Sequence, residues 1–138
     1  MLFRSCPVPA DLPLSLPIAS ARVRPGAADC FGGRLPARLA PWAEDIETNW
    51  THLEVAGPGW ALRALCAWRV VDGAGRMVTS GFECRGDEDL APLVGRRAVR
   101  AVVSPVGQVA DLDLRLDDGG RIELFTSWSA ASWRLETP

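Results

Sequence analysis

Apolar and charged side chains alternate strictly along residues 110–117. The even positions are apolar and the odd positions are charged, in the run Ala-Asp-Leu-Asp-Leu-Arg-Leu-Asp. A period of two is typical of a strand with one buried face and one solvated face. Residues 109–117 are therefore predicted to form a strand of an antiparallel sheet.

A second alternating run, residues 121–125, follows Asp118-Gly119-Gly120 and predicts a hairpin. The apolar residues share one face if Leu116 pairs with Ile122 and Leu114 with Leu124. This register leaves a three-residue loop whose last residue, Gly120, can adopt the left-handed conformation. The same register sets opposite charges across the hairpin, pairing Asp117 with Arg121 and Arg115 with Glu123.

Further strands are predicted at 50–55, 60–71, 76–82, 99–103 and 133–135, with turns at 57–59 and 104–108. A helix over 60–71 would also show an apolar stripe. The Asp72–Gly75 loop follows immediately, however, and favours a strand that returns as a hairpin. The expected buried face of 99–103 contains Val99, Ala101 and Val103.

Two short helical segments are predicted. Residues 41–48 begin with Pro41 and carry Glu44, Asp45 and Glu47 early, where acidic groups complement the helix dipole. Residues 87–95 form an acid-capped turn that ends at Gly95. Residues 1–38 are rich in Pro, Ala, Gly and Arg without a period, which predicts an extended or poorly ordered arm, partly along the sheet.

The pattern as a whole predicts an α+β fold. Residues 39–138 are expected to form a single globular domain after the arm. The domain is dominated by an antiparallel β-meander of about five or six strands, with one or two short helices.

Composition narrows the class of protein. All 15 basic residues are Arg, and this usage indicates a GC-rich bacterial genome. The net charge of −2 argues against a nucleic-acid partner, which normally needs a basic face. No apolar run approaches the length of a transmembrane helix, so no membrane partner is expected. A signal peptide needs an unbroken apolar core, and prolines interrupt the apolar residues of 1–21. We therefore expect a cytoplasmic protein.

The cysteines and the single histidine do not predict a metal site. Cys6, Cys30, Cys66 and Cys84 are far apart, and only His52 supplies an imidazole. We expect no cofactor. Cys66 lies on an apolar face and is predicted to be a core residue. A Cys66–Cys84 disulfide is the alternative in an oxidising compartment.

No catalytic residue is predicted. Different titratable groups gather only around His52, with Glu44, Asp45, Glu47 and Glu54, and no nucleophile stands in a recognisable frame. The simpler interpretation is that the carboxylates cap a helix and that His52 is a polar residue at a strand edge.

Tryptophans and arginines supply two further candidate sites. The chain has six Trp and no Tyr. Trp60 and Trp68 share a parity with Leu62 and Cys66 and are expected in the core, whereas Trp42 and Trp50 are candidates for a ligand cleft. An anion site could also form from Arg96, Arg97 and Arg100, although a solvated strand face is the favoured interpretation.

Several segments together resemble a known group of proteins. They are Ala67-Trp68-Arg69, Leu93-Val94-Gly95-Arg96, residues 111–119 and Trp133-Arg134-Leu135. This succession is similar to a group of small bacterial domains of unknown function, some of them grouped with immunity-type proteins that neutralise toxins. The resemblance covers about residues 60–138 and brings no catalytic residues with it.

We therefore expect a non-enzymatic, immunity-type protein that binds a macromolecule. Its binding face would be acidic, made by Asp111, Asp113 and Asp117, and would suit a basic protein partner. The alternative is a small-ligand-binding protein or weak hydrolase with a Trp-lined cleft, formed by Trp42 and Trp50, that uses His52. The oligomeric state is left open.

Overall fold

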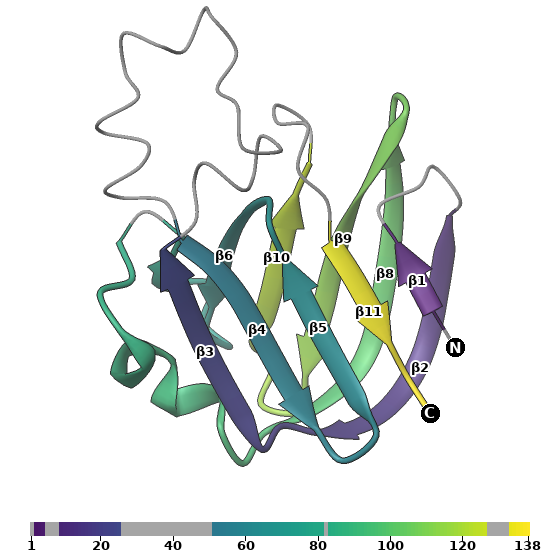
Figure 1. Cartoon of the computed structure of the whole chain (residues 1–138). Helices are drawn as coiled ribbons and strands as arrows, with labels where there is room; N and C mark the ends of the chain where they lie inside the picture. Colours follow the sequence, from purple (N-terminus) through teal and green to yellow (C-terminus); the bar gives the residue numbers. More distant parts are fainter. Residues whose placement is uncertain (1, 5–8, 26–50, 82, 127–132) are drawn as a thin grey trace, which may run out of the picture.

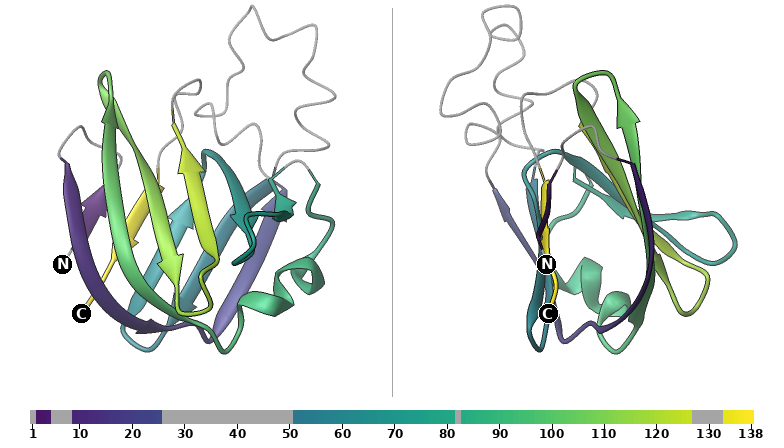
Figure 2. Two further views of the ribbon diagram at one scale, coloured as in Figure 1. Left: turned by 180° about the vertical axis from the view of Figure 1, so that it is seen from behind. Right: turned by 90° about the vertical axis from the view of Figure 1, so that its right-hand side faces the viewer.

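The computed structural model describes residues 2–4, 9–25, 51–81, 83–126 and 133–138 (Figure 1). These residues form two antiparallel sheets that pack face to face (Figure 2). Sheet A contains, in spatial order, β1 (Leu2–Arg4), β11 (Trp133–Glu136), β5 (Trp60–Ala64), β4 (Thr51–Gly57) and β3 (Ser20–Pro25). Sheet B contains β2 (Ala10–Pro17), β8 (Arg97–Val106), β9 (Val109–Leu116), β10 (Arg121–Phe125), β6 (Ala67–Val71) and β7 (Met77–Ser80).

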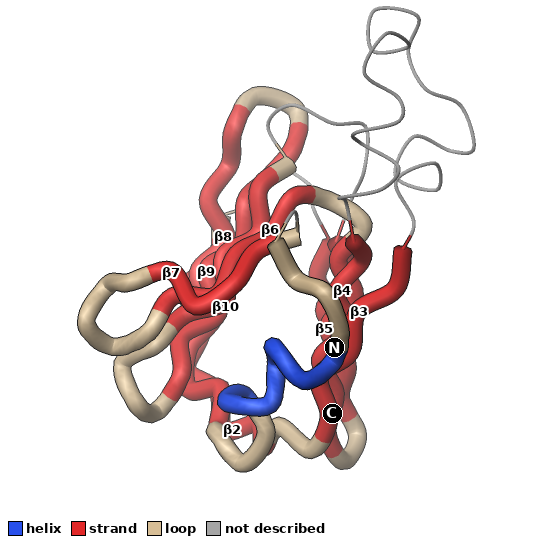
Figure 3. The backbone as a smooth tube through the Cα atoms, turned by 90° about the vertical axis from the view of Figure 1, so that its left-hand side faces the viewer, coloured by secondary structure: helices blue, strands red, loops and turns tan. Residues whose placement is uncertain are grey.

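The predicted antiparallel architecture is confirmed, but the strands are divided between two sheets instead of forming one meander. One short helix accompanies them in the described part of the chain, the 3₁₀ helix η2 (Asp87–Leu93). It lies at the predicted acid-capped turn, beside the edge strands β3 and β7 (Figure 3). Asp87 accepts a hydrogen bond from the backbone N–H of Val23, at 2.9 Å, and so ties η2 to β3.

The space between the sheets is filled by alternate side chains from both. Leu112, Leu114, Ile122 and Leu124 of sheet B are buried, as the alternation predicts. They face buried residues of sheet A, which include Leu53, Val55, Leu62 and Leu135. Burying each such side chain contributes roughly 1.5–3 kcal/mol, so this shared core is the main source of stability.

Trp60 and Trp68 belong to this core, as predicted, and Trp133 joins them. Each indole donates its N–H to a backbone carbonyl, at 2.8–2.9 Å, on Pro17, Thr51 and Ala110 respectively. A buried indole needs such a partner because an unsatisfied N–H is costly.

Residues 60–71 are extended, as predicted, but they form two strands in different sheets. The chain leaves β5 of sheet A after Ala64 and enters β6 of sheet B at Ala67. Cys66 lies at this crossing and is buried. No disulfide joins Cys66 to Cys84, so the alternative of such a bond is wrong.

Strands β1, β2 and β3 fall within the segment expected as an N-terminal arm. They are hydrogen-bonded members of the two sheets: β1 pairs with β11, β2 with β8 and β3 with β4. In the described residues this segment is thus extended, and it is built into the same core as the rest of the chain.

The predicted register of the β9–β10 hairpin is wrong by two residues. Leu114 pairs with Ile122, and Arg115 lies opposite Arg121, so the expected charge pairs across the hairpin do not form. The loop has the predicted length and ends in a left-handed glycine, but that residue is Gly119, with φ of 85°. Gly120 instead accepts a hydrogen bond at its carbonyl from the N–H of Leu116, at 2.9 Å, and closes the hairpin.

Strand β8 contains a bulge that the alternation did not predict. Its register against β9 shifts between Ala98 and Arg100. Ala98, Ala101 and Val103 are buried, whereas Val99 is only partly buried. The extra residue therefore moves Val99 off the core face and leaves Arg100 on the outer face.

Candidate functional site: an arginine groove

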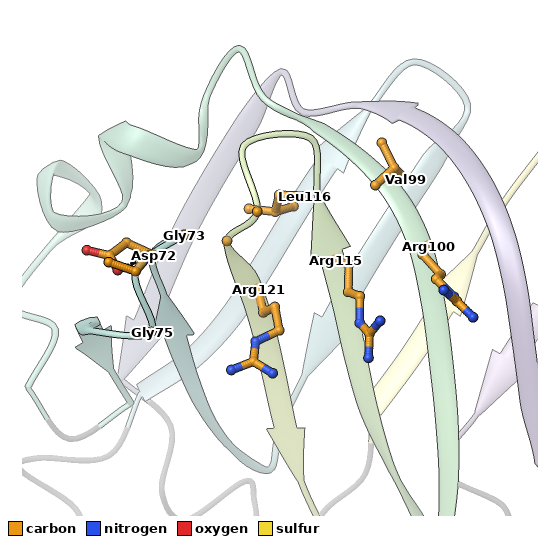
Figure 4. Close-up of a pocket in the computed structure, with 11 residues that line it drawn as sticks. Asp72, Gly73, Gly75, Val99, Arg100, Arg115, Leu116 and Arg121 are labelled. Carbon is orange, nitrogen blue, oxygen red and sulfur yellow. Dashed lines mark hydrogen bonds between the residues drawn. The ribbon is translucent and has the colours of Figure 1, made fainter.

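A groove of about 710 Å³ opens to solvent on the outer face of sheet B (Figure 4). Arg100, Arg115 and Arg121 line it, together with Val99 and Leu116. The β6–β7 and β9–β10 loops complete its wall with their glycines. We call this site the arginine groove.

The three arginines form one row across three neighbouring strands. Arg100 of β8 lies directly opposite Arg115 of β9, which lies directly opposite Arg121 of β10. Neighbouring strands are only about 4.8 Å apart, and like charges placed directly opposite each other are destabilising. The row therefore requires anions nearby.

Arg100 is the most completely neutralised of the three. Its Nε and Nη2 donate to Oδ1 and Oδ2 of Asp11 on β2, both at 2.6 Å, in the two-pronged geometry of a strong ion pair. The hydrogen bond from Arg100 lowers the pKa of Asp11 below its usual range. The same contact raises the pKa of Arg100.

Arg115 and Arg121 have more distant counter-ions. Arg115 Nε lies 3.5 Å from Asp113 Oδ2, and Arg121 Nη2 lies 3.4 Å from Glu123 Oε1. Charge-assisted hydrogen bonds between these groups are normally about 2.7–2.9 Å long. Both guanidinium groups therefore retain donors that their own carboxylates do not use.

Glu123 is shared between two arginines. Its Oε2 accepts a hydrogen bond from Arg69 Nε, at 2.5 Å, and Arg69 also lies over the ring of Phe125, at 5.2 Å from its centroid. Only Oε1 remains for Arg121. Glu123 therefore neutralises Arg121 incompletely.

The side chains of Arg115 and Arg121 are more exposed than the carboxylates beside them. They are 44% and 39% exposed, compared with 25% for Asp113 and 12% for Glu123. Arg100 and its partner Asp11 are about equally exposed, at 47% and 52%. A molecule that enters the groove meets the arginines first. The groove is suited to groups that accept hydrogen bonds and carry negative charge.

Among the described residues that line the groove, Asp72 is the only carboxylate. Its Oδ1 accepts hydrogen bonds from the backbone N–H groups of Ala74 and Arg76, both at 2.9 Å. It serves to fix the β6–β7 loop. The described part of the lining contains no Ser, Thr, Cys or His.

The three predicted acidic residues all lie at the outer face of sheet B or its border, but in different settings. Asp111 Oδ1 accepts the backbone N–H of the buried Thr126, at 2.9 Å, and is held in the structure. Asp113 neighbours Arg115, and its Oδ1 is buried without a hydrogen-bond partner in the described residues. Asp117 is exposed in the hairpin loop. The face thus carries both signs of charge.

His52 lies on the other side of the molecule, on the outer face of sheet A. Arg24 is directly opposite it, and a second hollow of about 390 Å³ is lined there by Arg24, His52, Leu53, Glu54, Arg63 and Leu65. The other predicted partners of His52, which are Trp42, Glu44, Asp45, Glu47 and Trp50, fall outside the described residues, as does the predicted helix at 41–48.

The arginines of the predicted anion site, Arg96, Arg97 and Arg100, each have a different partner. Arg96 Nε lies 3.3 Å from Asp118, Arg97 bonds the hydroxyl of Ser15 at 3.0 Å, and Arg100 bonds Asp11. The sequence reasoning missed Arg115 and Arg121. They flank the hairpin loop, and the correct register would have shown that they face each other.

The described residues were also compared with what a membrane-spanning helix or a metal site requires. No helix there is long and apolar enough to cross a membrane. No group of three or more His, Cys, Asp or Glu side chains in that part of the chain could hold a metal ion. Comparisons with protein-family models, with curated proteins and with solved structures find no match for this chain.

Proposed function

We propose that this chain is a non-enzymatic domain that binds another macromolecule through the outer face of sheet B, with the arginine groove at the centre. The observation that carries this proposal is the row of three directly opposed arginines. Such a row works against the stability of the sheet. Local conflicts of this kind are concentrated at functional sites, where a partner resolves them.

The shape of the groove favours a macromolecule over a small metabolite. Small-molecule sites are mostly apolar clefts that bury most of their ligand. This groove is open to solvent, and half-exposed guanidinium groups dominate it. Arginine is also enriched at protein interfaces, where its charge and its several donors fix the orientation of the partner.

The charge of the face indicates a partner with both signs of charge. Acidic groups of the partner would lie over the arginine groove, and basic groups would lie near the exposed Asp117. The sequence predicted a basic partner from Asp111, Asp113 and Asp117. We now propose a partner whose surface carries both acidic and basic groups. Complementary charges of this kind act mainly on the association rate and on specificity.

An immunity-type inhibitor is the form of this function that the resemblance of residues 60–138 suggests. On this proposal the partner is a bacterial toxin, and the product of a neighbouring gene is the first candidate. Co-expression should abolish its toxicity and give a stable complex. A toxin that remains active in the presence of excess protein would remove the immunity-type proposal while leaving the binding face to be tested.

The binding face is tested with charge-reversal variants. A partner captured from the native host is purified and its Kd is measured for the wild type, for Arg115→Glu/Arg121→Glu and for Arg63→Glu/Arg134→Glu. The last pair lies on the outer face of sheet A and is the matched control. We expect the Kd to rise about tenfold or more for the first variant only, because reversed charges repel the partner. Equal affinities for the two variants would place the interface elsewhere.

A further inference from the structure

We infer that Arg115 and Arg121 together hold one carboxylate group, supplied by an acidic side chain of a protein partner. This inference deepens the proposed function and rests on it. It names the chemical group recognised in the arginine groove, which nothing else about the chain assigns.

The two like-charged side chains repel each other across the β9–β10 hairpin. Arg115 and Arg121 are directly opposite each other, and each has its own carboxylate at 3.4–3.5 Å. Both counter-ions come from the next pair on the same face, in which Asp113 lies opposite Glu123. An anion that bridges the two guanidinium groups would remove the repulsion and would use donors that are otherwise left to water.

A second pair of arginines on sheet A provides an internal comparison. Arg63 and Arg134 are also directly opposite each other. Arg134 lies 2.7 Å from Glu136, and Arg63 lies 3.3 Å from Glu54. The hollow that both of these side chains line holds only about 10 Å³, compared with about 710 Å³ at the arginine groove. Arg63 also lines the hollow of about 390 Å³ beside His52, but Arg134 does not. The same like-charge pairing thus occurs twice, and on sheet B both arginines of the pair line one large groove.

The geometry suits a carboxylate. Figure 4 shows Arg115 and Arg121 side by side on β9 and β10, both extending away from the hairpin loop. The planar guanidinium presents a fork of donors that matches the two oxygens of a carboxylate. Two such forks on neighbouring strands can each donate to one oxygen of the same group. Arg100, which is occupied by Asp11, adds positive charge at the end of the row.

The charges that surround the pair favour a carboxylate over a phosphate group. Asp113 and Glu123 lie within 3.5 Å of the same guanidinium groups. Their repulsion of an incoming anion grows with the charge of that anion. A carboxylate carries one negative charge, whereas a phosphate group carries nearly two at neutral pH. The nearby acids therefore offset the additional attraction that Arg115 and Arg121 exert on a doubly charged phosphate group.

The test measures binding of two probes to the full chain by NMR titration at low salt. The probes are a hexaglutamate peptide with blocked ends and inorganic phosphate. We expect saturable binding of the peptide, with the largest shifts at residues around Arg115 and Arg121, and weaker binding of phosphate. Arg115→Gln and Arg121→Gln should each weaken peptide binding by about tenfold, because each removes one of two charge-assisted contacts.

The controls separate this site from general attraction between charges. Arg63→Gln and Arg134→Gln, made singly, each remove the same charge from sheet A and should leave peptide affinity within about twofold. Arg121→Lys keeps the charge but loses the fork, and it should weaken binding almost as much as Arg121→Gln. Unfolding midpoints in urea are measured for every variant, so that a loss of binding is not confused with a loss of folding.

Three results would overturn the inference: no saturable peptide binding, tighter binding of phosphate than of peptide, or equal losses in the groove and control variants. Its failure can be distinguished from failure of the proposed function. If a captured partner loses affinity on charge reversal in the groove while the peptide does not bind, macromolecule binding stands and the carboxylate assignment is wrong.

Discussion

Trp60 donates its indole N–H to the backbone carbonyl of Pro17 at 2.8 Å, and so joins the first residue of β5 in sheet A to the last residue of β2 in sheet B. Gly57, which pairs with Trp60, makes room for this contact. A Cβ at Gly57 would lie 1.9 Å from the Pro17 carbonyl oxygen. This hydrogen bond therefore joins the two sheets beside the point where the chain passes from β2 to β3.

Trp60→Phe tests this contact. Phenylalanine keeps an aromatic ring but leaves the Pro17 carbonyl without its donor, so we expect the free energy of unfolding to fall by about 1–3 kcal/mol. Urea unfolding followed by circular dichroism gives the value. Val94→Ala, at an exposed position, is the control and should change it by less than about 0.5 kcal/mol. A Trp60→Phe variant as stable as that control would contradict the role of the hydrogen bond.

Asp111→Ala should lower the free energy of unfolding, whether or not it also affects binding. The substitution leaves the backbone N–H of the buried Thr126 without its acceptor, which costs about 1–3 kcal/mol. Asp117→Ala removes an exposed carboxylate from the loop after the other end of β9 and should change stability little. Comparing the two urea midpoints checks this prediction. Equal midpoints would show that Asp111 is not needed to hold Thr126.

The Asp11–Arg100 ion pair should make stability depend on pH in the acid range. Because the hydrogen bond from Arg100 lowers the pKa of folded Asp11, the pair stabilises the fold fully above the unfolded pKa of about 3.9. The stabilisation is lost as the pH falls through the folded pKa. We expect the difference in urea midpoint between wild type and Asp11→Asn to be constant from about pH 5 to 7 and to vanish in stronger acid. A difference that grows on acidification would have the wrong sign.

Cys66 and Cys84 should react with a thiol reagent only when the protein unfolds. Both are buried, and burial is the main cause of a raised pKa for the Cys84 thiol, which keeps it protonated and unreactive. The measurement uses a Cys6→Ser/Cys30→Ser variant, in which labelling with Ellman's reagent is followed with and without urea. Rapid labelling in the absence of urea would show that these thiols are accessible in the native state.

The sides of β9 and β10 that face the core could be predicted because alternation depends on neighbouring residues alone. Alternation placed Leu112, Leu114, Ile122 and Leu124 in the interior. The division into two sheets could not be predicted in this way. Trp60, Leu62, Cys66 and Trp68 share one parity and are all buried, because both sheets face the same core and the pattern continues across the crossing.

The arginine groove could not be predicted because it depends on register. A slip of two residues leaves every apolar side chain on its own face and changes only which residues lie opposite each other. The register that pairs Asp117 with Arg121 and Arg115 with Glu123 therefore fits the apolar pattern as well as the observed register does. The loop settles the register: Gly119 takes the left-handed position, and Gly120, whose added Cβ would lie 2.9 Å from the Val71 carbonyl oxygen, packs as part of the strand end.

The pairing of β2 with β8 has a consequence for synthesis of the protein. Ala10 lies opposite Val103, so β2 leaves the ribosome long before its partner exists. Long-range pairing of this kind slows folding and exposes the nascent chain to association with its neighbours. Pro13 and Pro17, which lack an N–H, interrupt the ladder that a foreign strand would need. The prolines of β2 would thereby protect the nascent chain from aggregation until β8 has been synthesised.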